Sequence, residues 1–114
     1  MPYHKTLVIP ALTSSARTSS SASGSTLVDQ YVELGLEVSV TAVSGTIPFL
    51  TIVLQVSHDN SLWADHPDGC MTFVTTGVKH KIYQPIGGKY IRLSYYVSGT
   101  SPSFTFEANV IARS

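Results

Sequence analysis

The chain has 114 residues, of which 43% are hydrophobic and only 12% are charged, and its formal net charge at pH 7 is zero. This length is enough for one domain with its own core, and zero net charge argues against a general electrostatic binder of nucleic acid. The low charged fraction predicts a surface covered by hydroxyl groups. The single cysteine, Cys70, leaves no internal disulfide and no cysteine-based zinc pattern, and we expect it to be a small buried apolar residue.

The chain begins with a short apolar stretch followed by a run that is poor in apolar residues. The apolar stretch is too brief for a signal peptide, and no segment is long enough to cross a membrane, so we expect no secretion step of its own. Residues 13–26 are Ser, Thr, Ala and Gly except for Arg17. Such a run cannot fold alone because it has nothing to bury.

We therefore predict that residues 1–26 form an extended N-terminal arm that binds another surface through its apolar tip; a disordered tail is the alternative. The residues expected to make that contact are Leu7, Val8, Ile9, Leu12 and Arg17.

From Leu27 onward, apolar and polar residues alternate, which predicts one β-strand after another. The expected strands cover residues 33–41, 49–56, 70–75, 79–83, 89–97 and 104–112. No segment has a helical period with caps. Six to eight antiparallel strands at this spacing predict an all-β domain over residues 27–114, a single β-sandwich of jelly-roll or Ig-like type.

A Val-Ser-Gly-Thr-x-Pro pattern occurs at residues 43–48 and again at residues 97–102. Glycine permits a backbone conformation that other residues resist, and proline fixes φ where no ladder donor is wanted. Each copy follows one alternating segment and opens another. We therefore predict two equivalent β-hairpin turns.

A polar loop runs from Ser57 to Trp63, the only tryptophan. The side chains of Asp and Asn in such loops bond to their own backbone, so we expect Asp59 and Asn60 to shape the turn. Trp63 is expected to fold over the end of the sandwich.

The sequence carries no pattern that predicts catalysis. Ser, His and Asp are present, but no Gly-x-Ser-x-Gly turn holds a nucleophile near a base, so we predict that the protein is not an enzyme. The acidic stretch at residues 59–68 and the histidines His58, His66 and His80 lack the spacing of a metal site. We expect hydrogen-bonded turn residues there and no metal or cofactor.

Alternation along residues 89–97 places Tyr90, Arg92 and Tyr96 on one outward face. Tyrosine and arginine on a sheet face are typical of protein interfaces and also of single-stranded nucleic-acid sites. Zero net charge favours the protein interface. Exposed aromatic residues can also bind sugar, and in that alternative Trp63 and Asp59 are the contacts.

Three blocks of the sequence resemble virion proteins of tailed phages. Residues 11–18 with the Ser/Thr run look like the N-terminus of small virion proteins, and residues 36–63 and 88–106 are similar to β-sandwich modules of the same class. The blocks cover nearly the whole chain. His58 and Asn60 depart from the Asp-Gly turn that is commoner in these modules.

The resemblance implies a head decoration (cement) protein, which binds the outer surface of an icosahedral shell, often as a trimer, and bridges capsid subunits. The implied partners are the major capsid protein and further copies of this chain in a homotrimer. The implied location is the capsid surface of the virion, after assembly in the host cytoplasm. Neither nucleic acid nor a membrane is an expected partner. A tail or baseplate module and a carbohydrate-binding module for host attachment stay open as alternatives.

Overall fold

The structure, a computed structural model, describes residues 6–113. Seven β-strands make up this part of the chain: β1 (Thr6–Arg17), β2 (Ser21–Ala22), β3 (Thr26–Leu27), β4 (Glu33–Ser57), β5 (Ala64–Phe73), β6 (Gly77–Tyr83) and β7 (Tyr90–Arg113). Within the described residues there is no helix that could cross a membrane.

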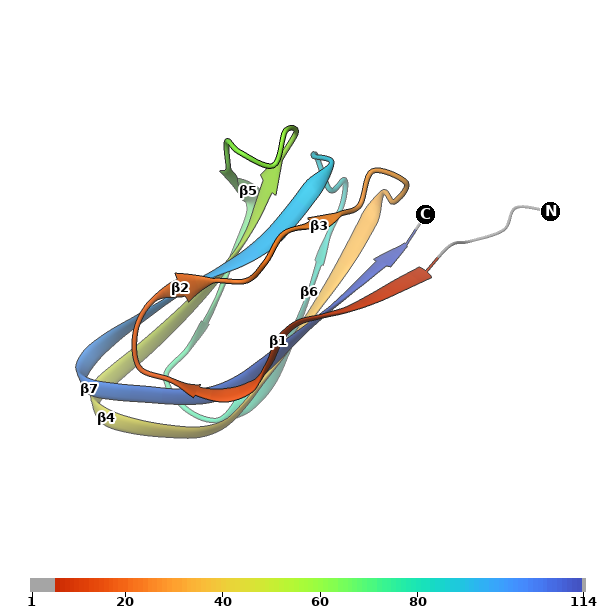
Figure 1. The fold of residues 1–114 in the computed structure, drawn as a ribbon. Helices are drawn as coiled ribbons and strands as arrows, with labels where there is room; N and C mark the ends of the chain where they lie inside the picture. The colour runs from red at the N-terminus through yellow and green to blue at the C-terminus, as the bar shows by residue number, and fades with distance from the viewer. Residues whose placement is uncertain (1–5, 114) are drawn as a thin grey trace.

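A long two-stranded ribbon of β4 and β7 organises the fold (Figure 1). The two strands run antiparallel over their whole lengths, from the pair Glu33 and Arg113 to the pair Ser57 and Tyr90. The ribbon folds over on itself, so its two halves form two facing layers. One layer adds β1 beside β7 and β6 beside β4, and the other adds β2 and β3 beside β7 and β5 beside β4. The prediction of an all-β antiparallel sandwich is confirmed.

The core lies between the two layers and draws its side chains from both halves of the ribbon. Its members on β4 and β7 are Leu34, Leu36, Val38, Val40, Leu50, Ile52, Leu54, Ile91, Leu93, Tyr95, Phe104, Phe106, Ala108, Val110 and Ala112. These residues alternate along the predicted strands, as burial on one face of a strand requires. The predicted strands 33–41 and 49–56 are two parts of β4, and 89–97 and 104–112 are two parts of β7.

The repeated Val-Ser-Gly-Thr-x-Pro pattern forms the fold of the ribbon, not two hairpin turns. We call residues 44–48 the β4 corner and residues 98–102 the β7 corner. The corners lie opposite each other, with Thr46 paired to Thr100. The hairpin prediction is wrong because glycine and proline indicate a local break in a strand, whereas the chain continues forward through both breaks.

The two corners share one backbone conformation. φ is positive at Gly45 (109°) and Gly99 (121°), and it is positive again two residues later at Ile47 (50°) and Ser101 (48°). A Cβ atom on Gly45 would lie 2.7 Å from the backbone oxygen of Ser101, and one on Gly99 would lie 2.8 Å from that of Ile47. Each corner therefore needs a glycine, both for its φ angle and for the close approach of the opposite corner.

The N-terminal segment is an edge of the sandwich and not an arm. β1 pairs with β7 from Thr6 opposite Arg113 to Arg17 opposite Phe104. β2 and β3 then continue beside the other half of β7. The prediction of a separate arm over residues 1–26 is therefore wrong for residues 6–26, and residues 1–5 lie outside the described part of the chain.

Polar bonds to β7 explain how the Ser/Thr run is ordered without apolar side chains. The backbone N–H of Leu93 donates to Ser23 Oγ (2.8 Å), and the N–H of Val97 donates to Ser20 Oγ (2.9 Å). The N–H of Ser23 donates in turn to the backbone oxygen of Leu93 (2.7 Å). The arm prediction counted only apolar burial and left out pairing with the edge of a sheet.

Candidate interaction surfaces

The residues predicted to form the contact tip of the arm do not share one surface. Leu12 belongs to the core, and Leu7 and Ile9 pack against it. Only Val8 is turned outward, with 61% of its surface exposed. Leu12 is therefore a core residue and not an exposed contact, whereas the contacts of Leu7, Val8 and Ile9 with another protein stay predictions.

Arg17 joins the two layers of its own sandwich. Its guanidinium donates to the backbone oxygens of Phe106 (2.8 Å) and Thr13 (2.8 Å). The same group lies 4.6 Å from the ring centre of Phe106 and 5.5 Å from that of Tyr95, which belong to opposite halves of β7. Arg17 is therefore an intramolecular tie between the two layers, and its contact with another protein stays a prediction.

A row of polar side chains crosses the outer face of β5, β4 and β7. Gln55 of β4 pairs in register with Asp65 on one side and Arg92 on the other. Arg92 Nε donates to Gln55 Oε1 (2.7 Å), and Gln55 Nε2 donates to Asp65 Oδ1 (2.9 Å). The row fixes the Arg92 guanidinium on this face.

Trp63 lies on the same outer face as the predicted tyrosine and arginine patch. The Arg92 guanidinium is 4.5 Å from the centre of the Trp63 ring, within the range of a cation–π contact. Tyr90 and Arg92 are half-buried on β7, and Tyr96 is exposed. The structure thus brings together residues that the sequence assigned to two alternative contacts, a capsid surface and a sugar.

Asp59 shapes its own loop, as expected. Its Oδ1 accepts hydrogen bonds from the backbone N–H groups of Ser61 (2.9 Å) and Leu62 (2.9 Å) and from Ser57 Oγ (3.0 Å). The bonds from Leu62, Ser61 and Ser57, in that order, lower the pKa of the Asp59 carboxyl below its usual value. A sugar contact through this oxygen would compete with those three bonds.

The histidines lie in three separate environments. His66 is buried, with Nε2 2.9 Å from the backbone oxygen of Pro85 and its ring edge-on to Tyr83. His80 Nδ1 lies 3.5 Å from Glu37 Oε2, whereas His58 is in the exposed loop. The described residues contain no group of three His, Cys, Asp or Glu side chains that could hold a metal ion.

Cys70 is exposed, so the prediction of a buried residue is wrong. Cys70 of β5 lies opposite Val53 of β4. The residues of β5 that face the core are Met71 and Phe73. Cysteine is usually buried, but its face on a strand depends on the register of that strand.

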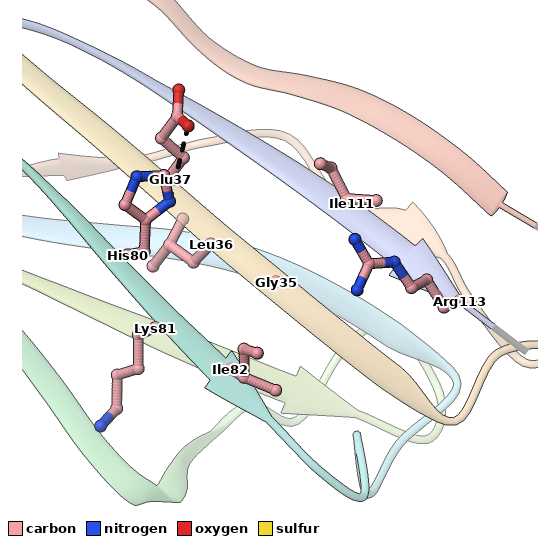
Figure 2. A pocket seen from close by; sticks show the side chains of 8 residues that line it. All are labelled: Gly35, Leu36, Glu37, His80, Lys81, Ile82, Ile111 and Arg113. Carbon is pink, nitrogen blue, oxygen red and sulfur yellow. Dashed lines mark ion pairs between the residues drawn. The ribbon is translucent and has the colours of Figure 1, made fainter.

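A hollow that the sequence analysis missed lies on the outer face of the other layer (Figure 2). Gly35 of β4 pairs with Ile82 of β6 and Ile111 of β7, and Val8 of β1 pairs with Ile111 on the far side. Val8, Ile111 and Ile82 thus form a row of apolar side chains across the strands. Because Gly35 has no side chain, a hollow of about 230 Å³ interrupts this row between Ile111 and Ile82. A Cβ on Gly35 would lie 3.9 Å from its nearest neighbour, so the fold does not require glycine here.

Charged side chains flank the Gly35 hollow on both sides. His80 pairs with Glu37 on one side, as the dashed line in Figure 2 shows, and Arg113 Nη1 lies 3.9 Å from Glu33 Oε1 on the other. An apolar floor with a charged rim suits an apolar side chain of a protein partner. The available sequence signal was the isolated glycine inside an alternating strand, which often marks a close approach by another group.

No family model matches the chain, and no curated protein matches it. Solved structures do resemble it. The SPBc2 prophage-derived protein YomS is 12% identical with a TM-score of 0.63, and the match covers 100% of this chain and 97% of that chain. A chain of infectious bursal disease virus, Gx strain, is 13% identical with a TM-score of 0.64, and the match covers 98% of this chain but 32% of the viral one.

The same fold also occurs outside viruses and prophages. The CBM36-1 domain of a multidomain xylanase from the hindgut metagenome of Trinervitermes trinervoides is 5% identical with a TM-score of 0.54, and the match covers 96% of each chain. At these identities the three comparisons show a shared fold.

Proposed function

We propose that this protein is a structural protein of a bacteriophage virion, and more specifically a decoration (cement) protein that binds the outside of the head and bridges capsid subunits as a homotrimer. The observation that carries this proposal is the fold shared with the prophage-derived YomS over almost the full length of both chains. The phage-like sequence blocks at residues 11–18, 36–63 and 88–106 support the same assignment.

In this proposal the contacts with the major capsid protein come from the body of the sandwich. One contact is the Gly35 hollow with Val8, Ile82 and Ile111 around it, and the other is the outer face that carries Tyr90 and Arg92. A protein that binds the assembled shell and not its free subunits stabilises the shell by mass action. Each further contact of an oligomer raises the avidity of that binding.

The experiment is particle binding with a variant that fills the hollow. Purified chain is added to phage heads that lack it, and occupancy is measured by mass spectrometry and cryo-microscopy. Gly35→Val should fold and should lower occupancy about tenfold or more, because its side chain occupies the space reserved for the partner. Gly24→Val, at an exposed glycine with open space around it, is the matched control and should bind as the original chain does.

Failure of the original chain to occupy heads would overturn the cement role. Density on the tail or baseplate in the same images would support the tail module instead.

A second candidate, a carbohydrate-binding module for host attachment, is favoured by one specific observation. The Trp63 ring lies on one face with the polar side chains of Arg92, Gln55 and Asp65, and aromatic rings beside hydrogen-bonding groups suit a sugar. A glycan array distinguishes the two candidates: binding that is lost in Trp63→Ala but kept in Gly35→Val would favour the sugar binder.

A further inference from the structure

Ile47 is unfavourable in two respects within its own protomer. Its φ of 50° lies in the left-handed region, which is costly for a β-branched residue. Its side chain is also 86% exposed, more than that of any other large hydrophobic residue in the described chain. The β7 corner has Ser101 at the equivalent position with nearly the same φ, so this backbone does not require isoleucine.

Ile47 belongs to an exposed apolar patch at the folded end of the ribbon. Phe49 is exposed two residues further on, and Tyr96 is exposed opposite Thr51 on the same outer face. Val74 is exposed just beyond Phe73, which pairs with Leu50. We call Ile47, Phe49, Val74 and Tyr96 the bend patch. Clustered exposed apolar side chains mark interaction sites in soluble proteins.

The segments that build this end of the molecule carry few charged side chains: Lys79, whose Nζ lies 5.0 Å from the ring centre of Phe73, and Arg17, opposite Phe104, flank the bend patch. Residues 18–28, 38–58, 69–78 and 93–106 have no Asp, Glu, Lys or Arg. Depletion of charge together with exposed aromatic residues is the composition of the centre of a protein interface. The composition of the bend patch is therefore that of a surface which becomes fully buried at the centre of an interface.

We propose that the bend patch is the surface through which copies of this chain associate, with Ile47 at its centre. The four side chains of the bend patch carry no charge, so they cannot select a charged partner by ion pairing, and the same side chains of further copies form an apolar surface that they meet without repulsion. Within the described chain, residues 41–49 of β4 pair with β7 alone, because β6 ends opposite Val40 and β5 ends opposite Leu50. Their second backbone edge is thus open to a neighbouring copy.

The size of the end predicts weak association. The two shorter dimensions of the body are 29 and 21 Å, so an end-to-end contact covers on the order of 600 Å² per copy, against about 800 Å² in a standard interface. We therefore expect association in the micromolar range. The inference rests on the proposed function only for the expectation that copies associate, and purified protein alone tests it, so it can fail while particle binding holds.

Sedimentation velocity of the full chain over ~1–200 µM tests the surface. The original chain should associate with rising concentration. Ile47→Ser, which copies the residue type of the β7 corner, and Val74→Ser, which leaves the corner intact, should each weaken association about tenfold or more. Leu62→Ser is the control, because Leu62 is 79% exposed in the loop at residues 58–63, outside the bend patch, and this variant should associate normally.

Three results would overturn the proposal. The first is that the original chain stays monomeric at every concentration. The second is that the patch variants fold and associate as strongly as the original chain. The third is that Leu62→Ser weakens association as much as the patch variants do. If the original chain is monomeric but Val74→Ser loses particle binding, the bend patch serves the shell and not a second copy.

Discussion

The β4 corner and the β7 corner have the same backbone but different surroundings. The β7 corner is supported by the N-terminal segment, since Val97 donates to Ser20 Oγ and Arg17 pairs with Phe104 beside it. The β4 corner has no such support among the described residues and carries the exposed Ile47. Glycine and proline spacing therefore sets the path of the chain, while the neighbours of each corner decide which side chains it carries.

The largest expected effect comes from replacing the glycine of each corner, because both corners need it for their shared backbone conformation. Gly45→Ala and Gly99→Ala should each lower the free energy of unfolding by more than about 3 kcal/mol, because the new Cβ meets backbone atoms of the opposite corner and φ is positive at both sites. Urea denaturation followed by circular dichroism measures the loss. Gly69→Ala is the control, since its φ is positive but nothing lies within 4 Å of the new atom, and it should lose about 1 kcal/mol. If alanine at one corner lowers the free energy of unfolding no more than Gly69→Ala does, that corner does not need its glycine and the two corners are not equivalent.

The packing of the N-terminal segment against the core gives the next largest effect. Leu12→Ala should cost about 2–4 kcal/mol of unfolding free energy, because Leu12 is 8% exposed within the core. Val8→Ala on the outer side of the same strand should change stability by less than about 0.5 kcal/mol. If the two variants have equal stability in the same denaturation experiment, β1 does not pack against the body.

A smaller loss should follow when the tie between the layers is removed. Arg17→Met should cost about 1–2 kcal/mol, because it removes a cation–π contact with two rings and a hydrogen bond to the backbone oxygen of Phe106. Arg113→Met is the matched control, since the exposed Arg113 pairs with Glu33 at 3.9 Å and should contribute less than about 0.5 kcal/mol. Equal melting temperatures of the two variants would show that Arg17 supports neither layer.

Sequence periodicity predicted the faces of the strands but not their continuity. Alternation assigned inner residues such as Leu36 and Phe106 correctly, because burial on one face of a strand imposes a period of two. It could not show that two predicted strands are one bent strand, because a break in the pattern looks the same in a hairpin and in a corner. Long-range pairing decides between them.

The candidate surfaces were harder to predict than the core. The outer faces carry mixed residues, so the row through Gln55 and the Trp63 contact of Arg92 depend on register between strands far apart in the chain. The Gly35 hollow depends on the two strands that flank it. The N-terminal segment was assigned to another surface because its pairing with the edge of β7 uses backbone and hydroxyl groups, which leave little trace in composition.

The smallest expected effect lies away from the corners, in the Asp59 loop. Hydrogen bonds lower the pKa of the Asp59 carboxyl in the folded state, so its contribution to stability is present above its usual pKa of 3.8 and is lost as the pH falls through the lower folded pKa. Asp59→Asn should therefore be slightly less stable than the original chain at pH 7, and the difference should shrink in acid below that window. Urea midpoints at several pH values measure it. A difference that stays constant with pH would show that the charge of Asp59 does not support the loop.

One folded ribbon, with its two corners opposite each other, builds both layers of the sandwich. Nuclear Overhauser contacts in solution measure this arrangement. We expect contacts between Thr46 and Thr100 and between Ser44 and Ser103, across the ribbon. Cross-strand contacts confined to residues 43–51 and, separately, to residues 97–105 would indicate two local hairpins and would contradict it.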